Sequence, residues 1–179
     1  MADLTDPNVQ KVIDVLNKAR SGELQAIHQY MVQSYTLNGM DYGQLSAYLK
    51  LIGIDEMRHA DKFAMRIRAL GGLPVCDNAG PIQQPQTVEQ IFSYDIDLES
   101  ATIRDYSEYA EICHKAGDPS SAGLLSGIIK DEEVHLGYYK ETMGHIKELG
   151  NAFLARYAAT SKHSGPIKSF VKLMEKEDF

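Results

Sequence analysis

A constant offset of 76 residues relates two parts of this chain. In each part a glutamate is followed, further along, by a Glu-x-x-His segment, and several neighbouring residues match at the same offset. Such a repeat predicts two similar halves. The matched pairs are Glu23 with Glu99, Glu56 with Glu132, His59 with His135, Ile27 with Ile103, Tyr30 with Tyr106, Leu49 with Leu125, Ile52 with Ile128, and Asp55 with Asp131.

Apolar residues recur at helical spacing in four long stretches. The first is placed at about residues 7–37, after the start signal Asp6-Pro7, and Asn38-Gly39 ends it. Asp41 is expected to cap the second stretch, which ends at Gly71-Gly72. The third and fourth stretches, which run from Phe92 to Ala110 and from Leu125 to Leu149, are separated by Gly117-Asp118-Pro119, a stop followed by a new N-cap.

The connection at residues 71–86 is rich in Gly, Pro, Gln and Asn and has no period. At roughly 3.3 Å per extended residue it can cross the whole length of a helix. Two antiparallel hairpins joined by one long crossover form the ferritin-like type of four-helix bundle, an all-α fold. A short apolar piece after Gly150 predicts a fifth short helix, so the bundle is expected to occupy residues 1–160 and a C-terminal tail residues 161–179.

Six residues interrupt the apolar stripes of the four helices. A carboxylate within a core stripe is costly unless it is paired or bound to a metal ion. Glu and His three residues apart share one helix face, so each Glu-x-x-His can offer an oxygen and a nitrogen to one ion. Salt bridges are the structural alternative, but no Lys or Arg falls on these stripes at that level. We therefore predict a two-metal carboxylate site made of Glu23, Glu56, His59, Glu99, Glu132 and His135.

A third Glu-x-x-His, from Glu111 to His114, has no counterpart at the 76-residue offset and lies about 120° around its helix from the stripe. We interpret it as background.

Charge and cysteine content narrow the function classes. The chain has 18 Lys and Arg against 25 Asp and Glu, a net charge of −7, which disfavours binding to nucleic acid or to a membrane surface and favours cations. Cys76 and Cys113 are too few for a disulfide framework. No leader pattern and no apolar run of about 18 residues is present, so a soluble, cytoplasmic protein is expected.

The segments GELQAIHQYM, IDEMRHAD, LES and KDEEVHLGYY resemble those of bacterioferritins, over about residues 8–158. The resemblance implies a di-iron site with one nitrogen ligand per iron and a tyrosine beside the centre. By this likeness Glu23 and Glu99 are terminal ligands, Glu56 and Glu132 bridging ligands, His59 and His135 the nitrogen ligands, and Tyr30 the nearby tyrosine.

The resemblance also implies a function. It is ferroxidase activity, the oxidation of two Fe(II) by O2 or peroxide, with storage of ferric mineral in a hollow shell of 24 chains built of dimers and an electron-donating ferredoxin partner. Haem, one per two chains, would be held by Met57 from both chains of a dimer; from the residues alone, Met57 reads as a surface or dimer-packing residue.

The chain departs from the family in two places. Leu51 stands where many bacterioferritins have a histidine for an iron site on the inner wall, and residues beyond about 160 have no clear family counterpart.

Three alternatives remain open on sequence. A carboxylate and histidine set does not choose iron over manganese, so a rubrerythrin-like peroxidase and a di-manganese catalase are both compatible with it. The absence of rubredoxin-type cysteine pairs disfavours the first. A DNA-protecting ferritin relative is disfavoured by the acidic charge and by the lack of a basic N-terminal arm.

Overall fold

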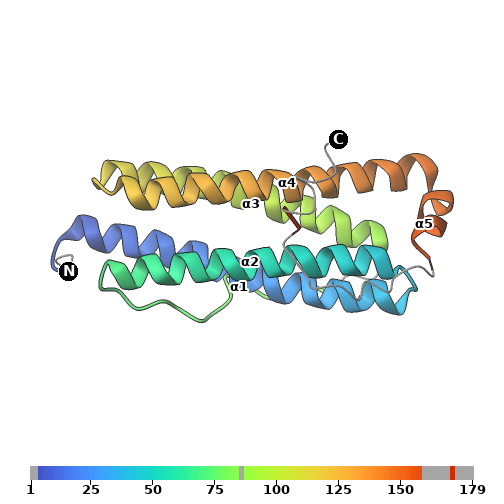
Figure 1. The fold of residues 1–179 in the computed structure, drawn as a ribbon, viewed down its shortest axis with the longest axis horizontal. Helices are drawn as coiled ribbons and strands as arrows, with labels where there is room; N and C mark the ends of the chain where they lie inside the picture. The colour runs from blue at the N-terminus through green and yellow to red at the C-terminus, as the bar shows by residue number, and fades with distance from the viewer. Residues whose placement is uncertain (1–3, 85–86, 159–169, 172–179) are drawn as a thin grey trace.

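The computed structural model describes residues 4–84, 87–158 and 170–171, and its long helices form a four-helix bundle (Figure 1). The predicted all-α class is confirmed, including the short fifth helix. The division into a bundle at 1–160 and a tail at 161–179 stays a prediction, since most of the tail lies outside the described residues. The helices are α1 (Pro7–Gly39), α2 (Gly43–Ala69), α3 (Val88–Lys115), α4 (Pro119–Leu149) and α5 (Asn151–Tyr157).

Side-chain caps begin three of the helices. The Asp6 carboxylate accepts a hydrogen bond from the amide of Asn8 at the start of α1, with a proline in the first turn. Thr87 and Gln90 form a reciprocal capping box on α3. Asp118 accepts from the amide of Ser121 at the start of α4. These contacts satisfy amides that have no partner within the helix.

The second helix begins differently from the prediction. Tyr42, not Asp41, is the N-cap residue of α2, and it makes no side-chain capping hydrogen bond. Asp41 lies one residue earlier, in the left-handed region with φ 66°, where aspartate is among the more tolerant residues. Asp41 therefore completes the tight turn from α1 into α2 instead of capping the helix.

The helices pair as two antiparallel hairpins, α1 with α2 and α3 with α4 (Figure 1). The long connection from α2 runs back along the first hairpin before α3 begins. It is held by α1: the Asn17 amide donates to Leu73 O and accepts from the amide of Val75, and the Gln29 amide bonds the backbone of Gln83 in both directions. The predicted crossover is thus fixed against α1 by hydrogen bonds.

Two apolar clusters fill the bundle, one towards each end. Along α1, the cluster near the N-terminus covers Val12 to Ala19, and the other covers Ala26 to Leu37. Along α2 and α4 the two clusters are separated in the same way. The buried polar residues at mid-length therefore lie between two close-packed apolar layers, which restrict the approach of water along the bundle axis.

None of the helices within the described residues is both long and apolar enough to cross a membrane.

Candidate metal centre

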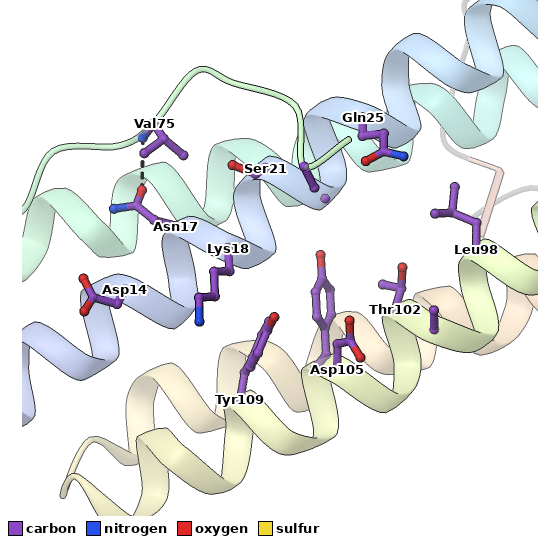
Figure 2. Close-up of a pocket in the computed structure, with 14 residues that line it drawn as sticks. Asp14, Asn17, Lys18, Ser21, Gln25, Val75, Leu98, Thr102, Asp105 and Tyr109 are labelled. Carbon is purple, nitrogen blue, oxygen red and sulfur yellow. Dashed lines mark hydrogen bonds between the residues drawn. The ribbon is translucent and has the colours of Figure 1, made fainter. Parts of the chain in front are cut away.

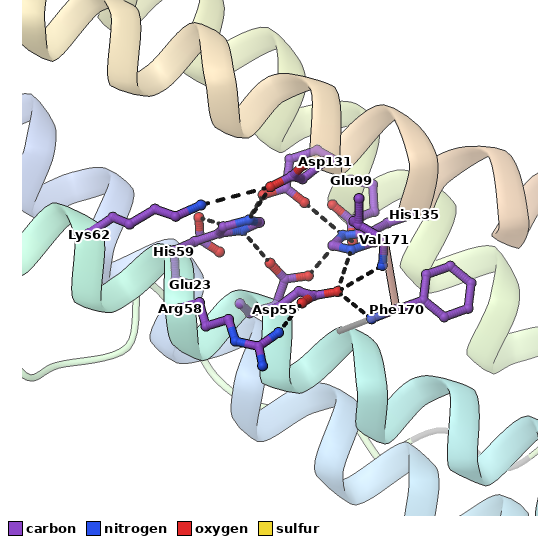
Figure 3. Close-up of polar contacts among 12 residues, drawn as sticks. Glu23, Asp55, Arg58, His59, Lys62, Glu99, Asp131, His135, Phe170 and Val171 are labelled. Atoms are coloured by element: carbon purple, nitrogen blue, oxygen red, sulfur yellow. Dashed lines mark hydrogen bonds and ion pairs between the residues drawn. The ribbon is translucent and has the colours of Figure 1, made fainter. Parts of the chain in front are cut away.

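The structure brings all six predicted site residues together at mid-length of the bundle (Figure 3). Each of the six residues is at most 2% exposed. Their ligand atoms form two overlapping groups, and within each group these atoms all lie within 4.8 Å of one another. One group consists of Glu23, Glu56, His59 and Glu132, and the other of Glu56, Glu99, Glu132 and His135.

Glu56 and Glu132 are shared between the two groups, each through both of its oxygens. His59 Nδ1 lies 2.9 Å from Glu56 Oε2 and 3.1 Å from Glu132 Oε1. His135 Nδ1 lies 2.9 Å from Glu132 Oε2 and 3.1 Å from Glu56 Oε1. The two halves thus mirror each other, as the 76-residue repeat predicted.

The outer carboxylates complete the halves at longer distances. Glu23 Oε1 lies 3.7 Å from His59 Nδ1, and Glu99 Oε1 lies 3.8 Å from His135 Nδ1. These distances exceed a hydrogen bond. Three carboxylate oxygens and one nitrogen therefore surround a common point in each half.

Two tyrosines hold the outer carboxylates. The Tyr30 hydroxyl donates to Glu99 Oε1 at 2.6 Å, so Tyr30 lies beside the cluster as expected. The Tyr106 hydroxyl donates to Glu23 Oε1, also at 2.6 Å. Sequence reasoning noted Tyr106 as the repeat partner of Tyr30 but gave it no role, although the common offset was the signal that could have found it.

Two aspartates stand behind the imidazoles. His59 Nε2 lies 3.1 Å from Asp131 Oδ2, within hydrogen-bond distance, and Asp131 is 3.9 Å from the Lys62 ammonium. His135 Nε2 lies 3.7 Å from Asp55 Oδ2, beyond a hydrogen bond. The sequence showed that these aspartates repeat, but it did not show that only Asp131 lies within hydrogen-bond distance of its imidazole. Asp131 fixes the His59 ring so that Nδ1 faces the carboxylates.

The pKa values of the cluster are shifted from their ordinary values in the direction that favours bound positive charge. Burial, followed by the charge of Glu132, raises the pKa of both Glu23 and Glu99 well above the ordinary value. Burial alone would lower the pKa of His59 and His135, but the charges of Glu132 and Glu56 respectively raise both instead. Burial alone would raise the pKa of Glu56, but the charge of His135 and the close approach of both imidazoles lower it to about 2. The cluster strongly favours bound positive charge.

Protons alone leave oxygens of the cluster without a partner. Each imidazole Nδ1 carries at most one proton and lies closest to the glutamate three residues before it. Within the described residues, Glu56 Oε1 and Glu132 Oε1 are buried and accept no hydrogen bond. Buried polar atoms seldom lack a partner. Carboxylate oxygens with one imidazole nitrogen per position suit Fe(II), Mn(II) and related divalent ions, so these residues fit a metal pair.

A cavity of about 730 Å³ is lined by residues of α1 and α3 (Figure 2). It lies between α1, α3 and the crossover near Val75 and Ala79, and its lining includes Gly22 and Tyr106. Since Tyr106 bonds Glu23, a single side chain connects the cavity wall to the cluster. The charged side chains that line it are Asp14, Lys18 and Asp105.

The remaining candidates lie away from the cluster. Met57 follows Glu56 on α2 but is 54% exposed, which agrees with its reading as a surface residue. Glu111 and His114 are exposed on α3, and Glu111 pairs with Lys115 at 2.7 Å. Their Glu-x-x-His spacing forms an ordinary surface segment.

Comparisons with known proteins agree with this geometry. A family model for the ferritin-like domain matches residues 13–149. The chain is 48% identical over 172 residues to a bacterioferritin of Desulfovibrio desulfuricans, covering 96% of both chains. It is 32% identical over 145 residues to a bacterioferritin of Mycobacterium tuberculosis, covering 81% of this chain and 89% of the relative.

A solved structure extends the likeness to three dimensions. The X-ray structure of Desulfovibrio desulfuricans bacterioferritin, with its diiron site in different catalytic states, superposes with a TM-score of 0.89 at 47% identity. The match covers 93% of this chain and 98% of that one. With its family-model match, its fold and its buried cluster able to hold a metal pair, this chain belongs to the bacterioferritins of the ferritin-like family.

Proposed function

We propose that this chain is an iron-storage protein that oxidises Fe(II) to Fe(III) at a di-iron centre. The observation that carries the proposal is the pair of overlapping ligand groups that share Glu56 and Glu132. The likeness to a bacterioferritin whose structure contains a diiron site supports iron over manganese, and it favours this function over a peroxidase, a catalase or a DNA-protecting shell.

The six side chains would hold two iron ions. Glu56 and Glu132 would bridge them, since each directs one oxygen towards His59 and the other towards His135. His59 and His135 would each supply Nδ1 to one iron. The outer carboxylates, Glu23 and Glu99, would complete one position each.

When bound, the two irons supply one electron each, enough to reduce O2 with two protons to H2O2, or H2O2 with two protons to two water molecules. The protein positions the ligands for this step. Tyr30 and Tyr106 hold the outer carboxylates by hydrogen bonds, and Asp131 holds the His59 ring. The apolar layers on either side of the cluster limit the access of water to the reacting site.

The storage proposal adds a hollow shell of 24 chains built of dimers. Large apolar side chains exposed on the single chain are compatible with this proposal, because contacts between chains would cover them. Met57 and Met65 on α2 are 54% and 65% exposed, Tyr35 on α1 is 60% exposed, and Leu73 on the crossover is 76% exposed. Light scattering should report a particle of many chains across salt and pH, and only monomer or dimer would contradict storage.

We also propose that haem binds between two chains through Met57 of each. The exposure of Met57 and its place directly after Glu56 support this, as does the family likeness. Thioether ligation favours reduced iron, which suits a centre that passes electrons inward to dissolve ferric mineral. An electron donor of the ferredoxin class and a cytoplasmic location belong to the same proposal.

Haem reconstitution tests the role of Met57. The wild type should bind one haem per two chains, and Met57→Leu should change its visible spectrum. Met65→Leu is the matched control, because Met65 is also an exposed methionine of α2. If the wild type binds no haem, or Met57→Leu leaves the spectrum unchanged, Met57 is not the ligand.

An anaerobic Fe(II) titration followed by O2 consumption tests the oxidase function. We expect two Fe(II) per chain and rapid oxidation, and loss of rapid oxidation in Glu23→Ala and His135→Ala, because each removes a ligand. His114→Ala is the control, since it removes the imidazole of the surface Glu-x-x-His segment. Wild-type rates in a Glu23→Ala, His135→Ala double variant would exclude the di-iron reading.

A further inference from the structure

The two halves of the cluster differ outside the repeated ligands. The Asp131 side chain, behind His59, is 30% exposed, whereas the Asp55 side chain, behind His135, is 5% exposed. Asp131 has the half-exposed Lys62 as a neighbour. Asp55 is covered by a segment near the C-terminus, which has no counterpart on the other half among the described residues.

That segment consists of Phe170 and Val171, which are helical and lie over the His135 side of the cluster (Figure 3). The amides of Phe170 and Val171 donate to Asp55 Oδ2 at 2.8 and 3.2 Å. Arg58 donates to the other oxygen, Oδ1, at 3.0 Å. The Asp55 carboxylate is thus held by a side chain of its own helix and by two backbone amides more than 100 residues away in sequence.

The Phe170 ring completes the cover. It is fully buried, and its centroid lies 6.1 Å from the His135 ring and 5.0 Å from the Tyr138 ring. It also contacts Tyr48 of α2 edge-on, at 5.8 Å. Phe170 therefore fills the space between α2 and α4 beside His135.

This cover changes how His135 is held. Because Asp55 Oδ2 accepts the two backbone amides, it lies 3.7 Å from His135 Nε2, and that nitrogen has no hydrogen-bond partner within the described part of the chain. His59 Nε2, in contrast, lies 3.1 Å from Asp131. Packing against Phe170 takes the place of a hydrogen bond in fixing the His135 ring.

The opposite half is more open. Asp131 is partly exposed, and the cavity of about 730 Å³ reaches Tyr106, which bonds Glu23. In the His135 half, the corresponding tyrosine is Tyr30, which bonds Glu99. Tyr30 is fully buried, and its ring centroid lies 5.9 Å from that of Tyr139.

We propose that Phe170 is a positioning residue that makes the two metal positions inequivalent. It closes the His135 position against metal exchange, while the His59 position exchanges with solvent. Release of a metal ion requires a ligand to swing away and water to enter, and Phe170 hinders both steps at His135. This inference rests on the proposed two-metal centre.

Exchange of Co(II) against excess Zn(II) tests it, with the visible bands of protein-bound Co(II) as the readout. The wild type should bind two Co(II) per chain and lose them in two phases of equal amplitude. Phe170→Ala should accelerate the slow phase about tenfold or more, the size of effect typical for residues that support metal ligands, and leave the fast phase unchanged. Phe170→Leu, which keeps apolar bulk, should restore most of the slow phase.

Phe153→Ala is the matched control. Phe153 is a buried phenylalanine of α5 that packs against His145 and Tyr157, away from the cluster, so its loss should leave both exchange rates unchanged. A wild type that loses both Co(II) at one rate overturns the proposal, even if Phe170→Ala does not fold. Equal acceleration of both phases, or of neither, in Phe170→Ala also overturns it. Binding of fewer than two Co(II), seen before exchange begins, contradicts the two-metal centre itself.

Discussion

The Tyr106 hydroxyl donates a 2.6 Å hydrogen bond to Oε1 of Glu23, from the opposite hairpin of the bundle. Tyr30 makes the same contact with Glu99 in the reverse direction between hairpins. Each outer carboxylate is therefore oriented by a residue of the other half. The bonds tie the two halves of the repeat to each other at the cluster.

Removing the Tyr106 hydroxyl should free the Glu23 carboxylate to move, while the remaining aromatic ring still fills its place in the core. We expect Tyr106→Phe to lower the Co(II) affinity of one position and the rate of Fe(II) oxidation by about tenfold, since loss of a group that orients a ligand typically has this effect. Titration and stopped-flow absorbance measure these quantities. Tyr109→Phe, in the wall of the same cavity, should change neither. Unchanged affinity and rate in Tyr106→Phe would show that Glu23 needs no orienting partner.

Metal binding should release protons. The pKa values of His59 and His135 are raised by the surrounding carboxylates, and those of Glu23 and Glu99 by burial and then by Glu132, so these groups hold protons that a metal ion must displace. Affinity should therefore fall as pH falls through neutrality. Calorimetry in buffers of different ionisation enthalpy counts the protons. No proton release at pH 7 would contradict the charge description of the cluster.

The Asp118–Arg66 pair should contribute to stability in a pH-dependent way. Burial alone would raise the pKa of Asp118, but hydrogen bonds from Arg66 and Ser121 lower it below its ordinary 3.8. A lowered folded-state pKa means that this stabilisation is present above about pH 4 and is lost as pH falls through the folded-state value.

We expect Asp118→Asn to lower the free energy of unfolding by about 1–2 kcal/mol at pH 7, because it weakens a charged pair at 2.7 Å and the α4 cap. Thermal or denaturant unfolding at fixed protein concentration measures the change. Asp105→Asn is the control: its 3.5 Å contact with Arg104 is exposed, so the change should be near zero. The difference between Asp118→Asn and wild type should shrink below pH 4.

The two cysteines should differ sharply in reactivity. Burial, followed by the charge of Asp118, raises the pKa of Cys113 to about 11, and its side chain is inaccessible, whereas Cys76 is exposed on the crossover. A thiol reagent at pH 8 should label one cysteine rapidly and the second only on unfolding. Cys76→Ser should abolish the rapid phase. Rapid labelling of Cys113 in the folded protein would show that the bundle opens at this end.

The sequence by itself determined the helices and the identity of the six cluster residues. Helical periodicity and caps such as Asp6 and Asp118 act over a few residues, so they can be read locally. The 76-residue offset then related Glu23 to Glu99, and the high cost of burying unpaired carboxylates predicted a shared cation site. The assignment of Asp41 as the cap of α2 was wrong, since Asp41 and Tyr42 differ by one position in a tight turn.

The tertiary structure alone decided which atoms meet. The sequence showed that Asp55 and Asp131 correspond, but not that Asp131 bonds His59 while Asp55 bonds the amides of Phe170 and Val171. Nothing in the sequence placed Phe170 beside His135. Contacts over such separations depend on how whole elements pack together, and a repeat in sequence does not require the surroundings of its two copies to be alike.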